Sequence, residues 1–166
     1  MNKKSLALLV LLFLIGGCAT TQGEKEKTGI APPLITQSFA AKQISPGENW
    51  EVYLNASDPD GDMKDIVCSI GQPGMGESSP SFTRIAKENA KELSGTIYLS
   101  TLNVASLNSS RLFTNLTLTV QIRDQQGHFS QPVVFPLSFV SSPKKETPPA
   151  GVFKEKDLGP IMISLF

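Results

Sequence analysis

The stretch Leu116-Thr117-Leu118-Thr119-Val120-Gln121-Ile122 decides the fold class of this chain. Its apolar and polar residues alternate with a period of two, which sends apolar side chains to one face of an extended strand and polar side chains to the other. Similar alternation recurs over residues 50–57, 66–70, 93–99 and 133–139. The dominant pattern of the chain is therefore that of half-buried β-strands.

Turn-forming segments separate these strands. Gly, Pro, Asn, Asp and Ser gather at residues 45–48, 58–62, 71–76 and 123–128, and these residue types favour the backbone angles of turns. About seven short strands between residues 32 and 140 predict an all-β, antiparallel sandwich. A parallel sheet would need helical crossovers, and no segment of helical period exceeds two turns. We expect residues 102–110 to form a crossover loop with Leu102 and Leu107 tucked under it.

Composition excludes several classes of function. The 166 residues include 15 Lys and Arg against 15 Asp and Glu, and this zero net charge gives no basic footprint for nucleic acid. Two cysteines and one histidine are too few for a structural zinc site made of Cys and His alone. The chain has neither a G-x-S-x-G elbow nor a phosphate-binding glycine loop. We therefore expect a non-enzymatic domain without a cofactor.

The N-terminus carries an export pattern. A basic start, Met1 to Lys4, precedes ten apolar residues, Leu6 to Ile15, whereas a bilayer span needs about 20. The run ends in Ile15-Gly16-Gly17-Cys18, which resembles the lipobox of bacterial lipoproteins. The resemblance implies that residues 1–17 are a signal peptide and that Cys18 is acylated. The alternative is a membrane-proximal cysteine after an ordinary signal peptide.

The lipoprotein resemblance also implies a location in the cell. Several acyl chains on Cys18 would form a durable membrane anchor, because each buried methylene contributes about 0.8 kcal/mol. In Gram-negative lipoproteins an aspartate after the cysteine is the usual inner-membrane retention signal, and here that residue is Ala19. A cell-envelope location follows, at the outer membrane on its periplasmic or surface face, or on the outer face of a single membrane. Residues 18–31 are polar and predict a flexible tether with a reach of about 20 Å.

A second resemblance concerns residues 32–140. Pro46-Gly47-Glu48, Asp58-Pro59-Asp60-Gly61-Asp62 and Val120-Gln121-Ile122-Arg123-Asp124 with Gly127 resemble bacterial immunoglobulin-like modules, which include cadherin-like and polycystic-kidney-disease-type domains. The resemblance implies one immunoglobulin-like sandwich. Such sandwiches serve as spacers, adhesins and binding modules alike.

One acidic turn is a weak calcium candidate. Asp58, Asp60 and Asp62, followed by Asp65, form the densest carboxylate cluster, and calcium prefers six to eight oxygen ligands. Some cadherin-like relatives bind calcium in acidic loops between repeats, and a single domain lacks the second repeat. The spacing also differs from that of an EF-hand loop. We therefore expect a solvated Asx-type turn and no metal site.

Three other side chains have simple interpretations. Cys68 lies on the apolar side of its strand and has no partner if Cys18 carries lipid, so it should be a buried free thiol. His128 should be a surface residue of a turn, without a nucleophile to activate. Tyr53 and Tyr98 lie on the polar sides of their strands and leave sugar stacking open.

The sequence leaves the binding residues and the partner unknown. The partners compatible with the resemblances are an envelope protein or a glycan. The alternatives to a plain binding or structural module are a pilotin-like accessory lipoprotein of an envelope assembly and a carbohydrate-binding module.

The C-terminal region divides in two. Residues 141–151 are rich in Pro, Lys and Ser and predict a linker. Within residues 152–166, Ile161, Ile163 and Leu165 share one parity, while Met162 and Phe166 share the other. Because both faces are apolar, we expect a strand added to an edge of its own sandwich or to a partner's edge. The alternative is a disordered tail.

Overall fold

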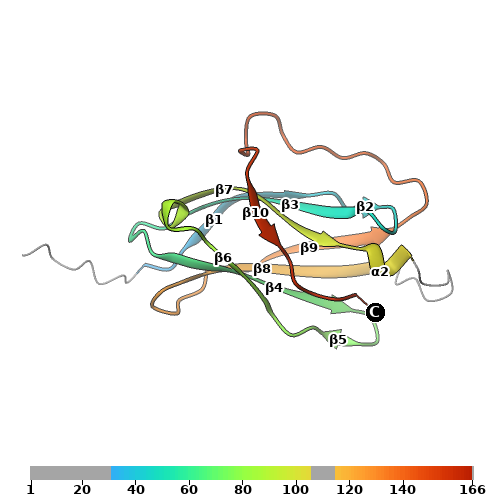
Figure 1. The fold of residues 1–166 in the computed structure, drawn as a ribbon, viewed down its shortest axis with the longest axis horizontal. Helices are drawn as coiled ribbons and strands as arrows, with labels where there is room; N and C mark the ends of the chain where they lie inside the picture. The colour runs from blue at the N-terminus through green and yellow to red at the C-terminus, as the bar shows by residue number, and fades with distance from the viewer. Residues whose placement is uncertain (1–30, 106–114, 166) are drawn as a thin grey trace, which may run out of the picture.

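The computed structural model describes residues 31–105 and 115–165, which form a two-layered β-structure (Figure 1). The first sheet has the order β1-β3-β7-β10; its strands are β1 (Leu34–Ala40), β3 (Asn49–Ser57), β7 (Glu92–Ser100) and β10 (Asp157–Pro160). The second has the order β2-β9-β8-β4-β5, and β6 also pairs with β4; its strands are β2 (Gln43–Ile44), β4 (Met63–Gln72), β5 (Gly76–Glu77), β6 (Ser81–Arg84), β8 (Asn115–Asp124) and β9 (Val133–Phe139). The described residues also include two short helical segments, η2 (Lys87–Asn89) and α2 (Leu102–Ala105).

This strand order confirms the predicted fold class, an immunoglobulin-like β-sandwich. In such folds the second and fifth strands share one sheet, while the third, sixth and seventh share the other, as β3 with β7 and β4 with β8 and β9 do here. The chain before β3 divides between the two sheets as β1 and β2. Two pairings, β2 with β9 and β10 with β7, are parallel, so the sheets are mixed rather than wholly antiparallel.

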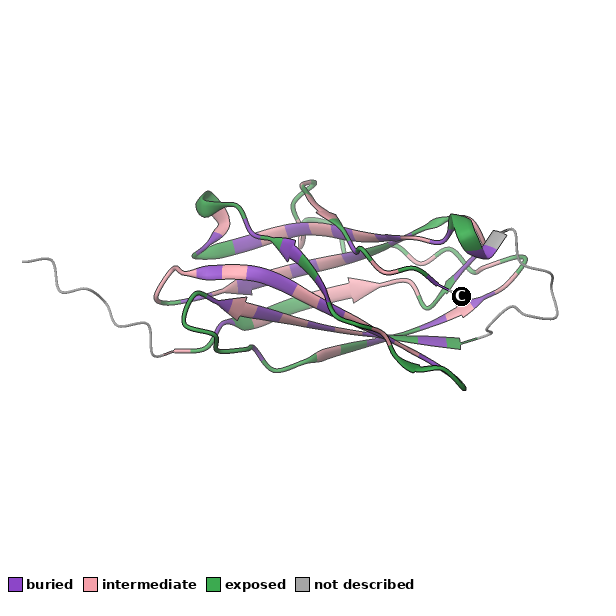
Figure 2. Ribbon diagram, turned by 60° about the horizontal axis from the view of Figure 1, so that its bottom comes forward, coloured by how far each residue is buried: buried purple, intermediate pink, exposed green. Residues whose placement is uncertain are grey.

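The alternation read from the sequence becomes the buried layer between the sheets. Figure 2 shows buried residues alternating with more exposed ones along the strands. On β3 the buried residues are Trp50, Val52, Leu54 and Ala56, and on β8 they include Leu116, Leu118, Val120 and Ile122. The indole of Trp50 is fully buried, and its Nε1–H donates a hydrogen bond to the carbonyl of Ala41 at 2.7 Å. The polar atom of the largest core side chain is thereby satisfied.

The expected packing of the crossover differs in detail. Leu102 is 67% exposed, whereas Val104 is 3% exposed and lies in the core. The reason is local: the single helical turn α2 directs Val104, rather than Leu102, toward the sandwich. Leu107 lies outside the described residues.

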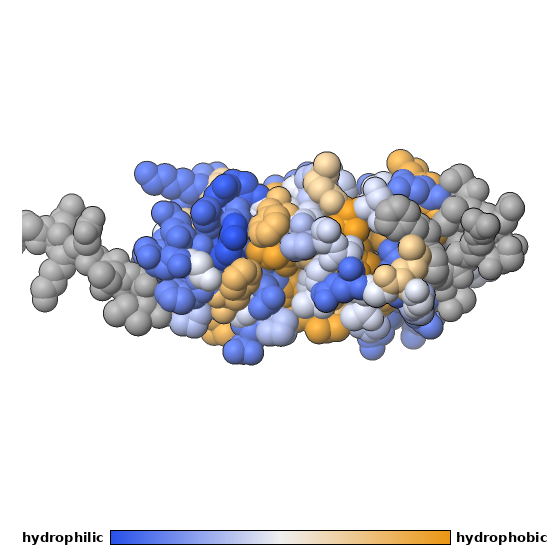
Figure 3. Space-filling model, turned by 90° about the horizontal axis from the view of Figure 1, so that it is seen from below, coloured by the Kyte–Doolittle hydropathy of each residue, from blue (hydrophilic) through white to orange (hydrophobic). Residues whose placement is uncertain are grey.

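Some large apolar side chains are exposed on the described surface. They are Leu34, Met75, Phe82, Leu102, Phe129, Val134 and Met162. On the face shown in Figure 3, hydrophobic areas alternate with hydrophilic ones. Exposed apolar side chains are ordinary on the surface of a folded domain.

The C-terminal segment docks on its own sandwich, as the first of the sequence alternatives predicted. It runs along the outside of the first sheet (Figure 1) and then forms β10 beside β7. Beyond β10, Ile161 and Leu165 are 4% and 5% exposed and join the core. Two side chains of β6 hold this segment against the second sheet: the Thr83 hydroxyl donates to the Pro160 carbonyl, and the Met162 amide donates to Ser81 Oγ.

The strand occupies only part of the segment 152–166 in which it was expected. β10 covers Asp157–Pro160, beside a site of close approach on β7 at Gly95. A Cβ atom at this position would lie 2.5 Å from the carbonyl oxygen of Lys156 and 2.8 Å from Leu158 Cγ. Any larger residue at Gly95 would push the C-terminal segment away from β7.

The docked C-terminus predicts a large stability effect. Ile161→Ala should lower the free energy of unfolding by about 2–5 kcal/mol, because it leaves a cavity in the core. Met162→Ala should change it by less than about 0.5 kcal/mol, since Met162 is 75% exposed. Chemical denaturation of the two purified variants measures this difference.

Deletion of residues 152–166 extends the comparison. We expect a lower melting temperature with an unchanged mass per particle in solution. Loss of a dimer on deletion would instead show that the segment is exchanged between copies, and an unchanged melting temperature would contradict docking altogether.

Candidate functional site

The predicted lipidation residue, Cys18, and most of the tether, 18–31, lie outside the described residues. Their assignment therefore stays a prediction from sequence. Within the described part of the chain, no helix combines the length and apolar character needed to cross a membrane.

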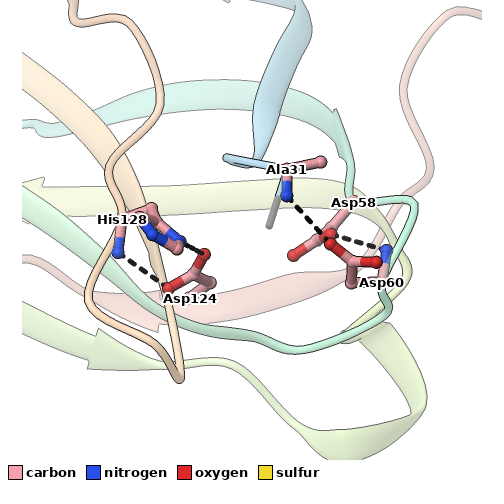
Figure 4. A network of polar contacts seen from close by, with 5 residues as sticks. All are labelled: Ala31, Asp58, Asp60, Asp124 and His128. Atoms are coloured by element: carbon pink, nitrogen blue, oxygen red, sulfur yellow. Dashed lines mark hydrogen bonds and ion pairs between the residues drawn. The ribbon is translucent and has the colours of Figure 1, made fainter. Parts of the chain in front are cut away.

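The acidic turn between β3 and β4 is the first candidate site (Figure 4). Asp58 is 1% exposed, and its Oδ1 accepts a hydrogen bond from the Asp60 amide at 2.9 Å. Gly61 completes the turn at a φ of 74°, a value that favours glycine. Asp60 Oδ2 in turn accepts from the amide of Ala31 at 3.1 Å. The expected Asx-type turn is thus present, and it also holds the point where the described chain begins.

Two carboxylates of this turn are close enough to share a proton. Asp58 Oδ2 and Asp62 Oδ1 are buried oxygen atoms with no hydrogen-bond donor among the described residues. Burial, a hydrogen bond with Asp58 and the negative charges of Asp58, Asp124 and Asp60 raise the pKa of Asp62 from 3.8 to about 6. A proton on Asp62 would satisfy the buried oxygen of Asp58.

The carboxylates that meet at the acidic turn differ from those that are close together in the sequence. Asp65, two residues into β4, lies elsewhere and forms ion pairs with Arg123 at 2.5 Å and Arg84 at 3.4 Å. Asp124, at the end of β8, contributes negative charge near Asp62 instead. Sequence spacing missed Asp124 because the two turns meet only when β4 and β8 pair.

His128 and Asp124 form a structural pair at the neighbouring turn (Figure 4). The His128 backbone amide donates to Asp124 Oδ1, and the Nδ1 atom of its ring lies 2.8 Å from Asp124 Oδ2. Asp124 is 1% exposed, so these contacts compensate for the burial of a carboxylate. The pair closes the turn between β8 and β9.

The absence of a calcium site at Asp58, Asp60 and Asp62 stays a prediction. Asp58 and Asp60 each already hold a backbone amide, and the described residues contain no group of three or more His, Cys, Asp or Glu arranged to hold a metal ion. We predict no micromolar calcium binding by Asp58, Asp60 and Asp62. Isothermal titration of the wild type and Asp60→Asn checks this, and micromolar binding lost in the variant would contradict it.

The shared proton predicts a pH effect on stability. The folded-state pKa of Asp62 lies above its unfolded value, so the unfolded chain releases this proton first and stability falls as pH rises from about 4 to about 6. Asp62→Asn cannot ionise, and its amide can donate to Asp58. At pH 7 it should gain about 1 kcal/mol, after allowance for solvent screening, or about 2–4 °C in melting temperature.

Thermal melts from pH 4 to pH 7 measure this effect, with Glu92→Gln as an exposed control for the loss of one carboxylate. The control should keep the wild-type pH dependence. A parallel fall of stability in the Asp62→Asn variant would refute the shared proton.

Cys68 is a core residue. It is 1% exposed, and burial raises the pKa of its thiol to about 12. The thiol therefore stays protonated at neutral pH and packs as a small apolar side chain, as the alternation of its strand indicated.

A hollow on the outer face of the first sheet is the second candidate site. It measures about 340 Å³ and is lined by Asn49, Glu51, Tyr53, Thr96, Tyr98, Glu155, Lys156 and Asp157. We call it the tyrosine pocket. The strand register builds it, since Glu51 lies opposite Tyr98, and Tyr53 lies opposite Thr96. The polar parity of Tyr53 and Tyr98 indicated that both would face outward, and both are half-buried in this pocket.

The pocket has an acidic character. The Tyr53 hydroxyl donates to Glu51 Oε2 at 2.5 Å. This hydrogen bond, partial burial and the negative charges of Glu51 and Glu155 raise the pKa of Tyr53 to about 12. Sequence reasoning missed Glu155 and Asp157, because they reach the pocket only when the C-terminal segment docks beside β7.

Comparison with known proteins gives one structural likeness. No protein-family model matches the chain, and no curated protein sequence matches it. Among solved structures, the chain is similar to the PKD domain of an M14-like peptidase from Thermoplasmatales archaeon SCGC AB-540-F20. The TM-score is 0.39 at 14% sequence identity, over 69% of this chain and 98% of that domain.

Proposed function

We propose that this protein is a lipid-anchored lipoprotein of the bacterial cell envelope that presents an immunoglobulin-like binding module. The observation that carries the proposal is the sequence Ile15-Gly16-Gly17-Cys18 behind an apolar run of ten residues. Acyl chains on Cys18 would hold the protein at the membrane. With Ala19 after the cysteine, the expected site in a Gram-negative host is the outer membrane.

The non-enzymatic part of the proposal is supported by the state of the reactive side chains. The Cys68 thiol is buried and protonated. His128 lies against the buried carboxylate of Asp124 and closes a turn. Each group therefore has a structural role, and neither presents a nucleophile and base in a shared cleft, which a hydrolytic site requires.

A binding role is supported by the position of the tyrosine pocket. Ala31, the last residue of the predicted tether, is hydrogen-bonded to the acidic turn at one end of the sandwich. The pocket lies instead on the outer side of the first sheet, over β3, β7 and the C-terminal segment. An anchor at the N-terminal end would thus leave the pocket accessible to an envelope protein or a glycan.

The anchor is tested by metabolic labelling with a fatty-acid analogue. Labelling should mark the wild type and be absent from Cys18→Ala, which should also leave the membrane fraction. Cys68→Ala, with Cys18 intact, is the matched control and should keep the label. Equal labelling of the wild type and Cys18→Ala would contradict the proposed anchor.

A further inference from the structure

We propose that the tyrosine pocket receives the side chain of a lysine or arginine of a protein partner. The inference rests on the proposed binding function and identifies the chemistry that the module would recognise. Its basis is the combination of three carboxylates with two tyrosine rings in one hollow of the first sheet.

The charge around the pocket is negative. Glu51, Glu155 and Asp157 line it and are exposed. Glu51 accepts a hydrogen bond from the Tyr53 hydroxyl, and Asp157 Oδ1 accepts one from the Gly159 amide, so neither contact brings a positive charge to the pocket. Three carboxylates facing one hollow attract a cation and repel an anion.

The one basic residue of the pocket does not neutralise it. The Nζ atom of Lys156 donates to Asn89 Oδ1 at 3.0 Å and lies 3.8 Å from Glu88 Oε1. Asn89 and Glu88 line a neighbouring hollow rather than the tyrosine pocket. The ammonium group of Lys156 is therefore engaged outside the tyrosine pocket. The carboxylates that line the pocket stay available to a second cation.

The aromatic side chains add a preference for an organic cation. A tyrosine ring attracts an ammonium or guanidinium group through its π-face. The ring of Tyr53 is supported by contacts with two other rings, its centroid lying 6.1 Å from that of Phe39 and 5.6 Å from that of Phe153. A supported ring loses little freedom when a ligand binds, which favours affinity.

Size and charge favour a basic side chain over a neutral sugar. A hollow of about 340 Å³ accommodates one long side chain, whose methylene groups would contact the tyrosine rings while its charged end meets the carboxylates. Ionised carboxylates only accept hydrogen bonds. The hydroxyl groups of a neutral sugar also donate to carboxylates, but a sugar brings no opposite charge, whereas a lysine or arginine side chain both donates hydrogen bonds and neutralises charge.

The test is an NMR titration of the full chain in detergent with capped Gly-Lys-Gly, Gly-Arg-Gly and Gly-norleucine-Gly peptides. We expect saturable shifts at the amides of Thr96 and Tyr98 with the lysine and arginine peptides only. Raising the salt concentration from 0.05 to about 0.5 M should weaken binding several-fold, because the pocket is open to solvent.

Variants link the binding to the pocket. Glu51→Gln and Glu155→Gln should each weaken binding about threefold and together about tenfold. Tyr98→Ala should also weaken it. Glu92→Gln, which removes one carboxylate from the same sheet outside the pocket, should leave the affinity within twofold. Melting temperatures verify that each variant is folded.

Three results would overturn the proposal. The norleucine peptide binding as well as the lysine peptide would show an apolar site. Chitotetraose binding that is lost in Tyr98→Ala but kept in Glu51→Gln would assign the pocket to a glycan. The absence of saturable shifts with the lysine and arginine peptides would exclude the cation. Lipid labelling of Cys18 is measured separately. Failure of the peptide titration therefore overturns only the proposed ligand of the pocket, and failure of the labelling overturns only the proposed anchor.

Discussion

Alternate side chains of β3 and β7 pack against alternate side chains of β4 and β8. This buried layer positions all the remaining strands and helices. Removal of apolar surface from water is the main favourable term in folding, and a shift of one residue in register would turn each strand's apolar set toward solvent. The register is therefore fixed by the side chains themselves. It sets which polar residues share the outer face of the first sheet, including Tyr53 and Tyr98.

The C-terminal segment completes that layer at an edge that the rest of the chain leaves open. In immunoglobulin-like sandwiches of the constant type, the fourth strand pairs beside the fifth. Here the chain after β4 stays with the second sheet as β6, and β10 occupies the place beside β7. β10 runs parallel to β7. Gly95 is what lets it approach.

The parts of the structure that were predictable from sequence are those set by local periodicity. Residues 50–57 and 116–122 have clear alternation, so the strands, the core and the outward position of both tyrosines could be read directly. Contacts between distant segments determine three other features: the partner of β10, the placement of β1 and β2 in different sheets, and the contribution of Asp124 to the acidic turn. Periodicity carries no information about such contacts. Asp65 was misplaced for the same reason, since its partner Arg123 is 58 residues away.

This dependence on distant contacts couples the tyrosine pocket to the integrity of the fold. Two strands fixed by the core, β3 and β7, carry Glu51, Tyr53 and Tyr98. The C-terminal segment, which docks beside β7, carries Glu155 and Asp157. Burial of Ile161 and Leu165 holds that segment in place, so core packing on one side of the sheet maintains an acidic surface on the other. A change that loosens the C-terminus would therefore remove two of the pocket's three carboxylates without altering either tyrosine. Stability and recognition are thus linked through one short strand.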